Sequence, residues 1–207
     1  MSAAVSIDGS VFATGRGLVE ASADLVGYLA WHDVFETDVS VCVPLEKIPD
    51  GGSLVYIPYP NFVDIVHVPH PSYVDIFDVN HGVLVRRISL GEQIQQVTDA
   101  MAIDSYGQTI YLITNAGLTV VRLGNAPLSI GHLVPSAGPA GIKVTVHGSG
   151  FQNGTVLTGN GSAVTTTFVD PNTLQAIIPS LTAGSVQITV SNPAGETYSL
   201  DNAFTVQ

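Results

Sequence analysis

Apolar and polar side chains alternate most clearly in the middle of the chain, where one phrase occurs twice. Residues 62–70 read Phe-Val-Asp-Ile-Val-His-Val-Pro-His, and about eleven residues later residues 73–81 read Tyr-Val-Asp-Ile-Phe-Asp-Val-Asn-His. Both copies alternate Val and Ile with acidic or aromatic residues, which is the two-residue period of a half-buried strand. The Pro-His-Pro-Ser sequence at 69–72 is typical of a turn. The pattern predicts a β-hairpin made by local duplication.

A second pattern is a phrase in which an Asp/Gly turn runs into an apolar strand. It occurs at residues 7–12, 49–56 and 103–111, and such turns favour hairpins. The first two occurrences are about 42 residues apart, close to the ~40–45 residues of a four-stranded propeller blade. The next gap is about 54 residues, and it falls to about 43 when the eleven-residue duplication is subtracted. The spacing predicts three blades in residues 1–127, with the duplication inserted in one of them.

These residues resemble the YVTN-type β-propeller repeat. Residues 104–115 are similar to its Asp-x-x-Gly-x-x-hydrophobic-Tyr-Val-x-Asn core, and residues 73–79 leading to 82–88 resemble its Val-x-Val-Ile-Asp strand. A closed propeller needs at least about four blades, so we expect an open fan or one completed by oligomerisation. Because open sheet edges pair readily, we expect a homo-oligomer formed by β-edge pairing. Part of a longer protein and a non-propeller β-sandwich are the alternatives.

The last third of the chain predicts a small sandwich. Residues 124–141 are rich in Gly and Pro and mark a domain boundary. Short strand candidates separated by turn signals follow, as in a Greek-key sandwich. They are Ile142–His147, Thr155–Thr158, Ala163–Phe168, Leu174–Ile178, Ser185–Ser191 and Ala203–Val206.

The same region resembles the IPT/TIG immunoglobulin-like family. Residues 135–141 followed by 144–151 resemble the opening phrase of that family, and residues 186–195 resemble its closing strand and turn. Residues 155–161 depart from the hydrophobic-x-Phe-Gly-Gly pattern usual in the family. The predicted fold is therefore all-β: about three propeller-like blades over residues 1–127, then an Ig-like (IPT/TIG) β-sandwich over residues 128–207.

Composition agrees with an all-β fold and limits the classes of partner that the chain can bind. Only 11% of residues are charged, 45% are hydrophobic, and Gly and Pro together number 33, which favours many short strands and argues against disorder. The net charge is −11, and 14 of the 17 acidic residues lie before residue 128. An acidic chain without a basic patch is a poor partner for nucleic acid. The lone Cys42 excludes an intrachain disulfide, and no stretch approaches the ~18 apolar residues of a membrane span.

Acidic residues gather in the duplicated phrase. If the two copies pair as a hairpin, Asp64 lies opposite Phe77 and Asp75 lies opposite Val66, which places the two carboxylates at a diagonal distance of roughly 7–8 Å. Asp64 and Asp75, with Asp78, are then candidate ligands for Ca²⁺, together with backbone carbonyls and water. The alternative is a solvent-facing acidic stripe.

Histidines gather in the same phrase. His67, His70 and His81 are candidate general bases or metal ligands. Pro69 interrupts the strand between the first two, so the alternative is a set of turn and surface histidines. No Gly-x-Ser-x-Gly nucleophile motif occurs, and we interpret Ser149 as structural.

Two classes of function follow. The first is a non-catalytic extracellular or surface protein that binds protein or glycan. The second is implied by the YVTN resemblance, since such repeats look like those of lactonase-type propellers. It is a Ca²⁺-dependent hydrolase of an ester or lactone such as an acyl-homoserine lactone, in which the metal activates water.

The pairing of the two resemblances implies an exported bacterial parent. The first residues, Met-Ser-Ala-Ala-Val-Ser-Ile-Asp, lack the basic and apolar regions of a signal peptide. We therefore expect this chain to be part of a longer secreted or cell-surface protein, and to be cytoplasmic if expressed as it stands.

Overall fold

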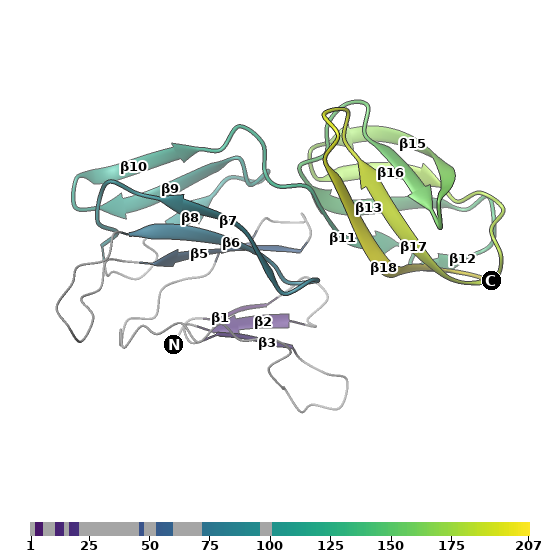
Figure 1. Cartoon of the computed structure of the whole chain (residues 1–207), viewed down its shortest axis with the longest axis horizontal. Helices are drawn as coiled ribbons and strands as arrows, with labels where there is room; N and C mark the ends of the chain where they lie inside the picture. The colour runs from purple at the N-terminus through teal and green to yellow at the C-terminus, as the bar shows by residue number, and fades with distance from the viewer. Residues whose placement is uncertain are drawn as a thin grey trace. The chain divides into compact units, whose positions relative to one another are not determined.

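A computed structural model describes the chain as a set of β-sheets (Figure 1). It gives the backbone of residues 3–5, 11–14, 17–20 and 46–47, and backbone with side chains for residues 53–59, 72–95 and 101–207. The all-β prediction is confirmed, because these ranges contain strands, turns and loops and no helix. They accordingly contain no helix long and apolar enough to cross a membrane.

The chain divides into two compact units. Unit 1 comprises Met1–Ile48 and Leu54–Gly124, and unit 2 comprises Asn125–Gln207 with the short segment Pro49–Ser53. The Gly- and Pro-rich stretch that was predicted to separate two domains begins at the end of unit 1.

The described residues of unit 1 form three antiparallel sheets, in which strands neighbour one another in chain order. The first sheet has β1 (Ala3–Val5), β2 (Val11–Thr14) and β3 (Gly17–Glu20). The second has β4 (Glu46–Lys47), β5 (Leu54–Tyr59), β6 (Tyr73–Asp78) and β7 (Val83–Ser89). The third has β8 (Met101–Ile103), β9 (Thr109–Thr114) and β10 (Gly117–Arg122). Each is a simple meander, the arrangement that hairpin connections produce.

The predicted pairing of the two duplicated copies is wrong. The second copy forms β6, and both of its edges are occupied by β5 and β7. Asp75 therefore lies opposite Ile57 and Arg87, where the predicted hairpin had placed Val66. The physical reason lies in β5, an apolar strand buried along its whole length, which gives β6 a better-buried neighbour. The first copy, residues 62–70, lies outside the described residues.

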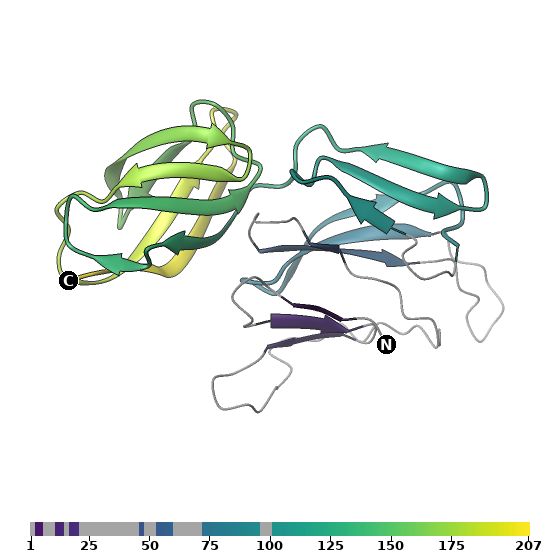
Figure 2. The same ribbon diagram turned by 180° about the vertical axis from the view of Figure 1, so that it is seen from behind.

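One hydrophobic core of unit 1 lies between its second and third sheets, which form two layers in both views (Figures 1 and 2). Tyr56 on β5 is fully buried, and its hydroxyl donates to the carbonyl of Gly107 in the turn before β9, at 2.9 Å. Burial raises the pKa of Tyr56 above its ordinary value. Other fully buried side chains of the two sheets are Leu54, Val74, Ile76, Met101, Ile110 and Leu112.

Unit 2 is a two-layer sandwich. Its strands are β11 (Ser129–Val134), β12 (Ala137–Gly138), β13 (Lys143–Ser149), β14 (Val156–Gly159), β15 (Ser162–Asp170), β16 (Thr173–Ile177), β17 (Gly184–Ser191) and β18 (Thr197–Val206). The order is β11-β13-β16-β15 in one layer and β14-β17-β18-β12 in the other, joined by the β14–β15 hairpin. Alternating apolar residues from both layers form one core, with Ile130, Val146, Leu174, Ile188 and Phe204 fully buried.

The Gly-Ser-Gly phrase at residues 148–150 is a packing feature of this sandwich. A Cβ on Gly148 would lie 2.2 Å from the carbonyl oxygen of Ser129, and Gly150 has a φ of 70° with its Cβ position 2.8 Å from the Pro127 oxygen. The buried Ser149 hydroxyl donates to the Pro127 carbonyl at 2.8 Å and lies 2.7 Å from the Ser129 hydroxyl. Ser149 is structural, as the sequence indicated.

Candidate interaction surface

Asp75, one of the predicted metal ligands, is held by an arginine. Its fully buried carboxylate accepts two hydrogen bonds, from Nε and Nη2 of Arg87 on the neighbouring strand, both at 2.7 Å. The hydrogen bond to Asp75 raises the pKa of Arg87 above its ordinary value. Because both carboxylate oxygens and the negative charge are already matched, a cation would have to displace Arg87 before Asp75 could bind it.

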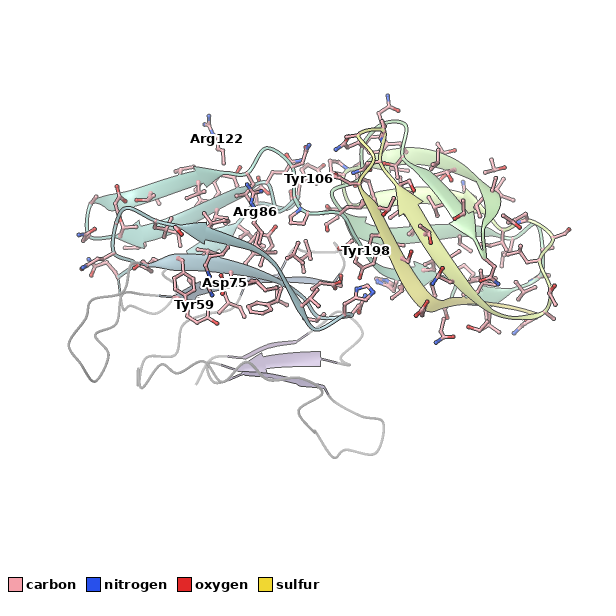
Figure 3. All side chains as sticks on the ribbon, in the orientation of Figure 1. Tyr59, Asp75, Arg86, Tyr106, Arg122 and Tyr198 are labelled. Carbon is pink, nitrogen blue, oxygen red and sulfur yellow. The ribbon has the colours of Figure 1, made fainter. Side chains whose placement is uncertain are left out.

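Two tyrosines extend this ion pair into a stack. The ring of Tyr59 lies 4.5 Å from that of Tyr73, and the Arg87 guanidinium carbon lies 4.0 Å above the centre of the Tyr73 ring. Figure 3 shows Tyr59 and Asp75 on neighbouring strands of the β4–β7 sheet. The Arg87 side chain is half exposed. The charge of Asp75 and the contact with the Tyr73 ring together hold it in place. The stack joins the edge strand β7 to the centre of its sheet.

Asp78 and His81, the other described site residues, meet in the turn between β6 and β7. Asp78 accepts a hydrogen bond from the Asn80 amide at 3.1 Å, and its other oxygen lies 2.5 Å from Nδ1 of His81. Asp75 and Asp78 are three residues apart on one strand, so their side chains leave opposite faces of the sheet. They do not converge on a shared cation.

The rest of the predicted site cannot be placed, because Asp64, His67 and His70 lie outside the described residues. Within the ranges that the structure describes, no three His, Cys, Asp or Glu side chains lie close enough together to hold a metal ion.

Glu92 forms a polar cluster that the sequence did not reveal. Its carboxylate accepts hydrogen bonds from the hydroxyls of Thr114, at 2.9 Å, and Thr119. These bonds, that from Thr119 first, lower the pKa of Glu92 below its ordinary value. Next to it, the Gln95 amide donates to the Ile113 carbonyl at 2.8 Å. The cluster attaches the segment after β7 to the β9–β10 hairpin.

Among the described residues of unit 1, apolar side chains gather on the outer face of the β8–β10 sheet, defined here as the side chains of Tyr111, Ile113, Leu118 and Val120. Leu118 pairs with Ile113 and Val120 pairs with Tyr111 across the two strands. Leu118 is 66% exposed and the other three are 40–45% exposed. The four therefore form one continuous apolar face.

This outer face was not predicted, because the side chains of β9 alternate between buried and exposed positions but not between apolar and polar residues. Ile110, Leu112 and Thr114 point into the core, but the intervening positions carry Tyr and Ile where a solvent-facing strand usually has polar residues. Arg122 extends from β10 at one end of the face (Figure 3).

Unit 2 offers a comparison for this surface. The outward positions of its β13, β15 and β16 are mostly polar, with Thr145, Thr165, Thr167 and Gln175 among them. Its exposed apolar side chains are not register partners of one another; they are Val134, Val156, Val169 and Ile177. Scattered exposed apolar residues are normal, whereas a continuous face marks a contact site.

The comparisons with known proteins agree with the fold of unit 2. Its two layers, antiparallel except for the β12–β18 pair, define the class as an immunoglobulin-like β-sandwich. More specifically, residues 128–206 match the family model of the IPT/TIG domain, so the predicted resemblance is confirmed for this part of the chain. No curated protein sequence matches the chain.

Several solved structures are similar to the chain at low identity. A gamma-CGTase from alkalophilic Bacillus clarkii has 14% identity and a TM-score of 0.39, over 78% of this chain and 25% of that one. SGBP-B, from a xyloglucan utilization locus of Bacteroides uniformis, has 16% identity and a TM-score of 0.35, over 78% and 49%. The plexin A4 extracellular region has 14% identity and a TM-score of 0.35, over 86% and 20%. The chain thus spans about half or less of the length of each.

Proposed function

We propose that this chain is a non-catalytic binding protein that contacts protein partners through the outer face of the β8–β10 sheet. The observation that carries the proposal is the continuous exposed apolar face of Tyr111, Ile113, Leu118 and Val120. Burying such a face against a partner is favourable by roughly 25 cal/mol per Å² of apolar surface. The IPT/TIG domain supports the same class of function, because domains of this family mediate protein interactions.

The partner that fits this face is a second copy of the chain. A self-complementary apolar face can pair with itself about a two-fold axis. Charge favours the same choice: the chain carries a net −11, so two copies repel, but residues 109–122 contain no acidic side chain. The outer face is thus a place where two copies meet with little like-charge repulsion. Because β10 is also an edge strand of its sheet, edge pairing and face packing would use the same strand.

We further infer that the sheets of unit 1 are propeller-like blades. The recurring Asp/Gly phrase precedes the second strand of each sheet, namely β2, β5 and β9. The β4–β7 sheet is a four-stranded meander, the topology of a blade. It packs face to face with the β8–β10 sheet, as adjacent blades do. On this inference the outer face of β8–β10 occupies the position where a further blade would pack, which a second copy would supply.

Light scattering coupled to size exclusion tests the proposal. The wild type should have about twice the 21.6 kDa mass of one chain at micromolar concentration. Leu118→Lys should reduce the mass to that of a monomer, because it places a charge in the apolar contact. Val156→Lys, at a similarly exposed position of unit 2, is the matched control and should leave the dimer intact. A wild type that is monomeric at every concentration, or a dimer unaffected by Leu118→Lys, would contradict the proposal.

A further inference from the structure

Two histidines lie side by side on the surface of the IPT/TIG domain. His132 on β11 and His147 on β13 are directly opposite each other in the antiparallel register. Their rings are stacked, with centroids 4.7 Å apart and planes 14° from parallel. Directly opposed residues have Cβ atoms roughly 4.5–5.5 Å apart, which allows two imidazoles to reach one small ion.

A bulge in β11 creates this juxtaposition. The pairing runs from Ile130 opposite Gly148 to His132 opposite His147, which leaves Gly131 as an extra residue. Ile130 is fully buried, so plain alternation would turn His132 toward the core. The extra residue instead turns it to the outward face that His147 shares. Bulges commonly re-aim a side chain in this way at functional positions.

The His147 ring also offers a nitrogen atom to a ligand. Its Nδ1 atom is buried and has no hydrogen-bond partner among the described residues. A neutral imidazole has one nitrogen that donates and one that accepts, and a buried ring nitrogen without a partner is unfavourable. A bound cation would satisfy that nitrogen if it carries the lone pair.

We propose that His132 and His147 form a two-imidazole site for a divalent transition metal. Imidazole is a preferred ligand of Cu²⁺, Ni²⁺ and Zn²⁺, and the expected affinity order places Cu²⁺ first and Mn²⁺ last. Ca²⁺ and Mg²⁺ prefer oxygen ligands and should not bind. Water molecules complete the coordination shell, because the described residues place no third His, Cys, Asp or Glu in such a group.

The site would have a structural consequence within unit 2. β11 is the edge strand of its layer and the first strand of the domain. A metal bound by both histidines joins this edge strand to β13. Since such a metal binds the folded state, it raises the stability of the domain by mass action.

Calorimetric titration of the full chain with Cu²⁺ tests this proposal. Each of His132→Gln and His147→Gln should weaken binding by about tenfold or more, because the second imidazole acts at a high effective concentration once the first has bound. The double variant lacks both imidazoles and should lose this binding step. His81→Gln removes one histidine from unit 1 and is the matched control, expected to leave this binding step unchanged.

A second measurement on the wild type does not depend on any variant folding. Paramagnetic Cu²⁺ should broaden the amide NMR signals of Val134, Thr145 and Thr173, which neighbour the pair in the register. Unchanged affinity in both single variants, or broadening confined to other parts of the chain, would overturn the proposal.

Discussion

Asp75 shows how little a single residue type says about its role. An acidic residue in an alternating strand predicted a metal ligand, because carboxylates bind cations and the strand has a solvent-facing side. Its actual partner, Arg87, lies twelve residues further along on β7. Only the register of the sheet brings the two together, and no local pattern carries that register.

The ion pair gives the first prediction. Arg87→Met should destabilise unit 1 by about 3–5 kcal/mol, because it leaves a buried carboxylate without its partner. Urea unfolding followed by fluorescence measures this, since Trp31 is the single tryptophan and belongs to unit 1. Arg86→Met, at the adjacent exposed position, is the control and should cost much less. Equal losses for the two variants would show that the Asp75 contact contributes little.

Gly148 gives the second prediction. A Cβ at this position would lie 2.2 Å from a backbone oxygen that cannot move without shifting β11. Gly148→Ala should therefore destabilise unit 2 by about 1–3 kcal/mol. Gly159→Ala places its Cβ 3.2 Å from the side chain of Leu181, which can adjust, and should cost less. Thermal unfolding of both variants checks the order, and a reversed order would contradict the packing argument.

At the scale of elements, unit 2 could be predicted largely from the sequence. Its core strands alternate cleanly, and Gly, Asn and Pro residues separate them, so each of the strand candidates overlaps an observed strand. β11 and β12 were missed because they lie in the Gly- and Pro-rich stretch that signals a boundary. The Gly131 bulge, which aligns His132 with His147, cannot be recognised from the periodicity of the sequence.

Unit 1 was predicted less well, again for a physical reason. The duplication suggested that neighbouring copies pair, but β6 has two edges and both are taken by β5 and β7. The predicted diagonal placement of Asp64 and Asp75 depended on that pairing, so this part of the prediction is wrong. The Glu92 cluster could not be predicted from the local sequence, because Thr114 and Thr119 donate to Glu92 from a hairpin more than twenty residues further along the chain.

The Glu92 cluster gives the third prediction. Thr119→Val removes its first hydrogen-bond donor, so the pKa of Glu92 should rise toward its ordinary value. Because the folded pKa is lowered, the ionised carboxylate stabilises unit 1 fully above the ordinary pKa of Glu. That contribution is lost as the pH falls through the lowered folded value.

A carboxyl NMR titration of Glu92 measures the change directly. Thr109→Val is the control on β9, because Thr109 makes no hydrogen bond to Glu92. An unchanged Glu92 titration in Thr119→Val would contradict the assignment of the lowered pKa to these hydroxyls.

At the scale of the whole molecule, the chain combines an IPT/TIG domain with a set of meander sheets, and the β8–β10 sheet exposes a continuous apolar face. The low charge of residues 109–122 and their open edge distinguish this face from the polar outer surface of unit 2. This exposed apolar face favours recognition of a partner through the outer face.

Hydrogen–deuterium exchange at two protein concentrations tests this claim most directly. As the concentration rises, backbone amides of residues 109–122 in the wild type should become more protected, while those of β13 and β16 in unit 2 should not change. In Leu118→Lys the gain in protection should be absent. Exchange in residues 109–122 that is the same at both concentrations, or protection that develops only elsewhere, would contradict the account.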